Sequence, residues 1–123
     1  MSKITTGNTE YTSNASLTSH HYKLNSSGII TDDTASRVLS TNDNGRIIYF
    51  TSNSAITVTT AASLGVGFSC TLIQAGTGQI TVTAGSNTTI NSYGGFVKSA
   101  GQYAIVGIIS PVADAFILGG NLI

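Results

Sequence analysis

Residues 72–82 read LIQAGTGQITV, and the role of the two glycines in this stretch decides how the chain is interpreted. Gly76 and Gly78 fit either a loop that binds phosphate or a tight turn between two strands. A dinucleotide-binding G-x-G-x-x-G loop needs a third glycine, and that position is Thr81, inside a strand-like run. A phosphate-binding loop also leads into a helix and carries a lysine, and neither follows here. The stretch therefore predicts a β-hairpin turn in which Gly76 and Gly78 adopt positive φ angles.

Short runs of alternating apolar and polar residues surround this turn on both sides. Phe68, Cys70 and Leu72 occupy alternate positions before it, and Ile80 and Val82 do so after it. A period of two predicts half-buried strands. Further strands are expected at residues 46–51, 55–60, 88–91, 95–99, 103–110 and 115–120. So many short strands predict an all-β fold, a single antiparallel β-sandwich or small barrel.

One tetrapeptide, ITVT, occurs twice, at residues 56–59 and 80–83. A solenoid needs at least three repeats of one unit to bury a continuous core. We therefore attribute the recurrence to composition, because Ile, Val and Thr are all common in strands.

The chain divides near residue 30. Before that point, isolated apolar residues lie among small polar ones, with neither a helical face nor a sustained alternation. Residues 1–30 are therefore expected to form an extended polar N-terminal arm, and residues 31–123 a β-sandwich body. The first residues lack the apolar core of a secretory signal, so none is expected.

The composition favours a protein that is built into an assembly. The 123 residues fit one domain, only 8% of them are charged against a usual ~25%, and the formal net charge is zero. Such a chain has no basic field to attract nucleic acid or an anionic membrane. A neutral surface also tends to associate. The apolar run at 103–120 contains Pro111 and Asp114, which predicts two strands rather than a membrane span.

Chemically reactive residues are few. The single cysteine, Cys70, lies in an alternating apolar run and is expected to be a small core residue. The stretch STNDNG resembles a calcium loop only in part, because Ser40 and Thr51 occupy positions where such loops place carboxylates, so it predicts a turn. His20 and His21 are adjacent and would point to opposite sides of an extended segment, so we expect no metal site there.

The acidic and aromatic side chains also indicate no active site. A catalytic carboxylate pair is not expected from the five acids, which are Glu10, Asp32, Asp33, Asp43 and Asp114. Asp32 and Asp33 are expected to orient a turn. Four tyrosines that could stack on a sugar or base are expected in the core or an interface instead, namely Tyr22, Tyr49, Tyr93 and Tyr103. We therefore predict no catalytic, cofactor-binding or metal-binding residue, no cofactor, and no enzyme activity.

Several stretches in order carry a resemblance to a known kind of protein. They are DNGRIIYFTS, ITVTTAASLGVGFSCTLIQAGTGQITVTAG, TTINSYGGFVKSAGQYAIVGII and AFILGG, at residues 43–52, 56–85, 88–109 and 115–120. Together they resemble a small β module of bacteriophage virion proteins, found in head-decorating and tail-fibre-associated chains. The resemblance covers about three-quarters of the chain and implies a structural role on the virion.

On this basis the expected function is that of a non-enzymatic virion structural protein. The sharper expectation is a capsid decoration or cement protein that bridges major capsid subunits, is located on the capsid surface and forms a homo-oligomer, with a trimer favoured. The alternative is a tail-fibre or spike component, or an adaptor, with a fibre or baseplate chain as partner and a role in host attachment.

Overall fold

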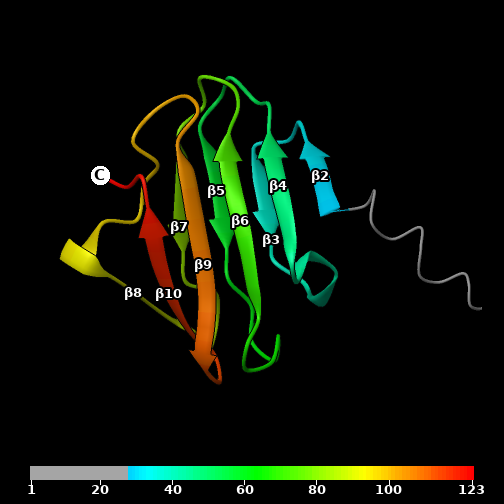
Figure 1. Ribbon diagram of the computed structural model, residues 1–123, viewed down its shortest axis with the longest axis vertical. Coiled ribbons are helices and arrows are strands. Elements are labelled where there is room, and N and C mark those ends of the chain that lie inside the picture. Colours follow the sequence, from blue (N-terminus) through cyan, green and yellow to red (C-terminus); the bar gives the residue numbers. More distant parts are fainter. Residues whose placement is uncertain (1–27) are drawn as a thin grey trace, which may run out of the picture.

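The computed structural model of the chain describes residues 28–123, which form two β-sheets packed face to face (Figure 1). The six-stranded sheet has the order β2-β4-β6-β9-β10-β8, and the three-stranded sheet has the order β3-β5-β7. The strands are β2 (Ile29–Asp32), β3 (Ser36–Val38), β4 (Arg46–Phe50), β5 (Ile56–Thr59), β6 (Ser69–Gln74), β7 (Ile80–Thr83), β8 (Thr89–Ser92), β9 (Ile105–Val112) and β10 (Ala115–Gly120). Two short 3₁₀ helices, η2 (Thr41–Asp43) and η3 (Tyr93–Gly95), lie between strands.

The first six of these strands wind as a solenoid. The chain alternates between the two sheets, so that β2, β4 and β6 fall in one and β3, β5 and β7 in the other. Each strand lies parallel to the equivalent strand of the next coil, and three coils are stacked in this way. The fold is all-β as expected, but the prediction of a single antiparallel β-sandwich or small barrel is wrong.

The two ITVT tetrapeptides are the clearest sign of the solenoid. They form β5 and β7, which pair in parallel and in register, with Ile56 beside Ile80 and Val58 beside Val82. The hydroxyl groups of Thr59 and Thr83, 24 residues apart in the chain, lie 3.2 Å from each other. The attribution of this recurrence to composition is therefore wrong, because the repeats occupy equivalent places in successive coils.

Gly76 and Gly78 lie where two coils stack closely, and not in a hairpin. The connection from β6 to β7 crosses between the sheets and packs on the connection from β4 to β5, where the Gly78 amide donates to the Ser52 carbonyl at 3.1 Å. A Cβ at position 76 would lie 2.5 Å from the same oxygen, and one at position 78 would overlap the Ser54 carbonyl. Neither glycine has a positive φ angle. The hairpin prediction is wrong, because close backbone approach requires these glycines.

The remaining strands complete the larger sheet. β9 lies antiparallel to both β6 and β10, and β8 lies parallel to β10. The expected strand at 95–99 is reduced to isolated bridges, in which the Val82 amide donates to the Val97 carbonyl and the Ser99 amide to the Ile80 carbonyl, both at 2.9 Å. These bridges cover the free edge of β7.

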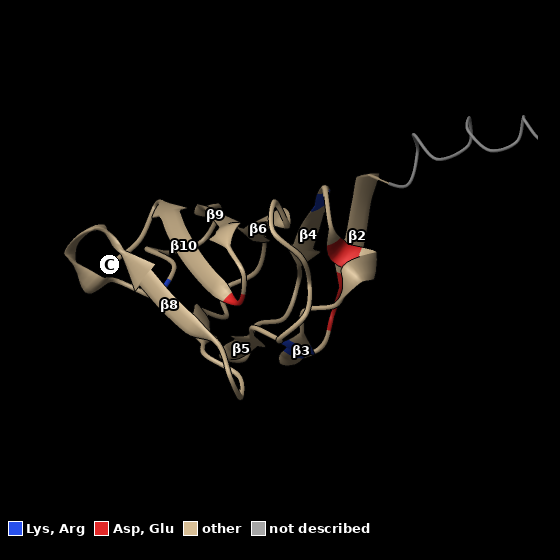
Figure 2. Cartoon of the chain, turned by 90° about the horizontal axis from the view of Figure 1, so that it is seen from below, with Lys and Arg blue, Asp and Glu red and all other residues tan. Residues whose placement is uncertain are grey.

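The core fills the space between the two sheets, which Figure 2 shows edge-on as two layers. The alternating residues Phe68, Cys70 and Leu72 are buried as predicted, and the Phe68 ring meets the Phe116 ring edge to face, with 6.2 Å between centroids. The strand β2 begins at Ile29, two residues before the expected start of the body. The predicted arm otherwise lies outside the described residues. No helix within residues 28–123 has the length and apolar character to cross a membrane.

Candidate functional site: the outer face of the six-stranded sheet

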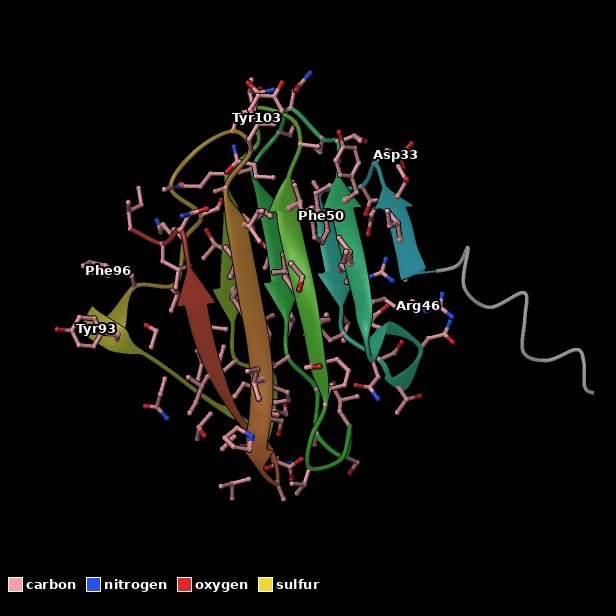
Figure 3. All side chains as sticks on the ribbon, in the orientation of Figure 1. Asp33, Arg46, Phe50, Tyr93, Phe96 and Tyr103 are labelled. Atoms are coloured by element: carbon pink, nitrogen blue, oxygen red, sulfur yellow. The ribbon has the colours of Figure 1, made fainter. Side chains whose placement is uncertain are left out.

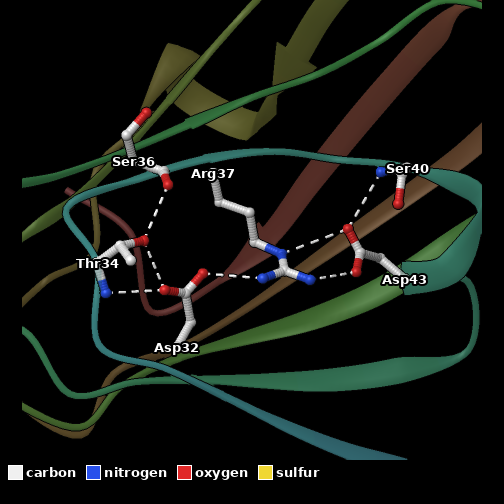
Figure 4. Close-up of polar contacts among 6 residues, drawn as sticks. All are labelled: Asp32, Thr34, Ser36, Arg37, Ser40 and Asp43. Atoms are coloured by element: carbon white, nitrogen blue, oxygen red, sulfur yellow. Dashed lines mark hydrogen bonds and ion pairs between the residues drawn. The ribbon is translucent and has the colours of Figure 1, made fainter.

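Two of the candidate carboxylates come together around one guanidinium group. Arg37 on β3 contacts Asp43 of η2 through Nη2 and Oδ1 at 2.6 Å, and Asp32 of β2 through Nη1 and Oδ2 at 2.8 Å (Figure 4). The Ser40 amide donates to the second oxygen of Asp43 at 3.1 Å. Thr34 donates to Asp32 from both its amide and its hydroxyl, which is the turn role expected for Asp32. We name Asp32, Arg37 and Asp43 the charged cluster.

Within residues 28–123, the charged cluster lies at the end of the solenoid that β2 and β3 form. Asp43 is completely buried, Asp32 nearly so, and Arg37 lies between the sheets in register with the core residue Val58. Figure 2 shows acidic and basic residues gathered at this end of the molecule. Solenoids require such polar ends, because an exposed apolar end would stack on other molecules without limit. The cluster therefore has a structural role.

The contacts within the cluster shift the pKa values of Asp32 and Arg37 toward their charged forms. Burial opposes ionisation of Asp32, but its hydrogen bonds with Thr34 and its contacts with Arg37 outweigh this and lower its pKa. The hydrogen bonds with Asp43, opposed by burial and reinforced by Asp32, raise the pKa of Arg37. Both carboxylates are thus engaged in contacts with Arg37.

The stretch STNDNG forms the expected turn, and the other candidates stay apart. Gly45 has a φ of +74°, and η2 supplies the bend before it. Asp33 is exposed beyond the end of β2 (Figure 3), and Asp114 accepts from the Ser63 amide at 2.8 Å. Within residues 28–123 no three His, Cys, Asp or Glu side chains gather as metal ligands would. Glu10, His20, His21 and Tyr22 lie outside the described residues.

Cys70 is a core residue, as predicted, and its surroundings suppress its chemistry. The side chain points between the sheets and is buried. Burial, with the negative charge of Asp43 adding to it, raises the pKa of Cys70 to about 12. Because the thiolate is the nucleophile, this thiol is unreactive at neutral pH.

We therefore expect Cys70 to resist alkylation in the native protein. With a pKa near 12 instead of about 8.5, the thiolate fraction at pH 8 falls on the order of 1,000-fold, and burial blocks access as well. Mass spectrometry after treatment with iodoacetamide measures the rate, with the same chain in denaturant as the control. Equal rates in the two conditions would contradict the buried position.

The feature that stands out on the surface is the outward side of the six-stranded sheet, which we name the outer sheet face. Its exposed apolar residues are Ile29, Ile47, Tyr49, Ile105, Ile109 and Ile117. They come from the four strands β2, β4, β9 and β10, and the outward strand positions between them carry no Asp, Glu, Lys or Arg. Arg46, at the start of β4, borders the face. A contiguous apolar surface of this kind marks an interaction site in soluble proteins.

The middle of the outer sheet face is lower than its borders. Thr71, Gly107 and Gly119 lie side by side on β6, β9 and β10. A shallow hollow of about 320 Å³ lies over β6, with Ile47 on one side and Ile109 on the other. The face thus combines isoleucine ridges with a depression whose floor includes Thr71 and Gly107 and whose border includes Arg46.

A second exposed feature lies beside β8. Tyr93 in η3 is 98% exposed, and Phe96 projects from the same turn (Figure 3). The Ser92 hydroxyl donates to the Phe96 carbonyl at 2.6 Å and fixes this turn. Tyr93 and Tyr103 are exposed and so do not lie in the core, and their expected place in an interface stays a prediction.

The outer sheet face could not be recognised from the alternation of residues alone. In β4 and β9 apolar residues occupy both sets of alternate positions, so the sequence does not show which side of these strands faces outward. The Ile-rich composition of both sets was the signal that could have revealed two apolar sides. Comparison of the chain with models of known protein families and with curated proteins finds no match.

Proposed function

We propose that this protein is a non-enzymatic structural protein of a bacteriophage virion, and specifically a capsid decoration protein that bridges major capsid subunits. The observation that carries the proposal is the outer sheet face, with six exposed apolar residues and no charged residue at its outward strand positions. A freely diffusing monomer seldom keeps such a surface uncovered, whereas an assembly subunit buries it. The resemblance of residues 32–120 to virion β modules supports the same role.

The rest of the surface fits a protein that works through many weak contacts. With so few charged residues, the exposed loops and the three-stranded sheet present Ser, Thr and Asn hydroxyl and amide groups. Such groups hydrogen-bond to a partner without the large desolvation cost of charges. A capsid subunit junction offers several such surfaces at once, and a homo-oligomeric decoration protein, with a trimer favoured, meets them with several copies.

Gold labelling of intact virions with an antibody to this protein tests the location directly. Label distributed over the whole head is expected, as viewed by electron microscopy. The control is a preparation of virions from a phage whose gene for this chain has been deleted. These virions should carry no label. Label confined to the tail would overturn the decoration role.

A tail-fibre or spike component is the second candidate, and one observation favours it. Tyr93 and Phe96 form an exposed aromatic pair on a glycine-rich turn, and aromatic rings stack on sugar faces. In that role the protein would bind glycans of the bacterial surface. Two results together would establish this candidate in place of the first. They are gold label on the tail, and binding of the protein to host glycans that is lost in the Tyr93→Ala variant.

A further inference from the structure

Two strand glycines have no explanation within the single chain. Gly107 on β9 and Gly119 on β10 are direct partners in the sheet, and neither has a positive φ angle. A Cβ at either position would meet no atom within 4 Å. Glycine inside a strand weakens it, because the unfolded chain gains entropy and no side chain packs. Strand glycines without an internal reason mark a place where another chain or a ligand approaches closely.

The surroundings of these glycines show what kind of chain fits. Ile105 and Ile109 stand on either side of Gly107 along β9, and Ile117 stands beside Gly119 on β10. The hollow over β6 lies between Ile47 and Ile109. A complementary partner therefore has protruding apolar side chains that fit into the hollow. It also has a hollow of its own that accommodates these isoleucines. The outer sheet face itself has both.

We propose that the outer sheet face binds the same face of a second copy of this chain. Such a contact between identical faces closes as a two-fold dimer, in place of the trimer favoured above. The proposal deepens the structural role proposed above by naming one partner of the subunit, and it rests on that role only for its biological setting. The outward strand positions of the face carry no charged side chain, so its apolar centre can meet a second copy without burying an unpaired ion there, while Arg46 lies at the border of the hollow. Packed sheets lie about 10 Å apart, and the glycines allow the isoleucines to interdigitate at this distance.

The size of the face suits a stable contact. Six strands about 4.8 Å apart give a width of roughly 25 Å, and strands of this length are roughly 15–25 Å long. Specific interfaces bury about 800 Å² of accessible surface on each partner. A corrugated face with this outline, together with the side chains at its rim, supplies area of that order.

Two substitutions test the proposal in the full-length chain. Gly107→Val fills the depression, and because valine favours strands and meets open space, the single chain should keep or gain thermal stability. Ile109→Lys places a charge on the ridge. Size-exclusion chromatography with light scattering is expected to show an oligomer for the wild type and at least a tenfold higher dissociation constant for each variant.

Val38→Lys is the matched control. Val38 is a β-branched strand residue, 62% exposed, on the opposite face of the molecule in the three-stranded sheet. This variant should associate as the wild type does. A monomeric wild type, or an oligomer that survives both Gly107→Val and Ile109→Lys, would overturn the proposal. Since gold labelling reports location alone, a failure here and a failure of the virion role are separate results.

Discussion

Replacing Asp43 with alanine is expected to lower the free energy of unfolding by about 3 kcal/mol. Its carboxylate is completely buried and binds Arg37 with both oxygens, at 2.6 and 3.4 Å. Removing one partner of a buried ion pair leaves the other partly uncompensated, at a cost of about 3–5 kcal/mol. Arg37 keeps Asp32 and some contact with water, which places the expected loss at the lower end. Urea unfolding followed by circular dichroism measures it.

Asp33→Ala is the control for this experiment. Asp33 belongs to the same acidic pair as Asp32 but is exposed, so its removal should change stability by no more than about 0.5 kcal/mol. Replacing the whole charged cluster with Asp32→Asn, Arg37→Met and Asp43→Leu should recover part of the loss, because no buried charge is then left without a partner. Equal stability of Asp43→Ala and Asp33→Ala would show that the charged cluster does not stabilise this end of the solenoid.

Gly78→Ala is expected to destabilise the fold by about 3 kcal/mol, a large effect for the addition of one methyl group. The new Cβ would overlap the Ser54 carbonyl, and backbone atoms cannot move aside as a side chain would. Separation of the two stacked connections would also weaken the hydrogen bond from the Gly78 amide to the Ser52 carbonyl. The shift of the midpoint in thermal or urea unfolding measures the effect.

The matched control is Gly101→Ala. Gly101 also lies in a connection and also lacks a positive φ angle, but a Cβ there meets no atom within 4 Å. Its replacement should be neutral or stabilising by up to about 1 kcal/mol, because alanine restricts the unfolded chain. Equal stability of Gly78→Ala and Gly101→Ala would show that the connections at residues 51–54 and 75–79 do not stack closely.

The sequence predicted most strands but not their direction, and the reason is physical. Alternation along β5, β6 and β7 reports that one side of each strand faces a core. That pattern is typical of antiparallel sheets with one wet face. A solenoid also leaves one side of each parallel sheet in water. The same alternation therefore arises from parallel strands as well as from antiparallel ones. Only the repeated ITVT indicated that the strands run parallel. The equivalent strand of the first coil, Ser36–Val38, has the sequence SRV and does not resemble ITVT.

The candidate site was less predictable than the strands, because it depends on pairing across the sheet. Gly107 and Gly119 are separated in the chain by a hairpin, and their position as neighbours follows from the register of β9 with β10. Arg37 is one of five basic residues in the sequence, and nothing local to it indicated that Asp32 and Asp43 flank it. The burial of Cys70, by contrast, follows from its own strand and was predicted.

The strand order of the larger sheet also bears on how the chain folds during synthesis. All three coils are complete once Thr83 has been added, whereas β9, which lies between β6 and β10, comes from the last part of the chain. At about 5–20 residues per second, the ribosome needs several more seconds to finish β10. During that interval the edge of β6 exposes unpaired amide and carbonyl groups, as an unfinished sheet does. Vectorial synthesis therefore builds the solenoid first, and docking of the β9–β10 hairpin onto this edge ends the vulnerable stage of a newly made chain.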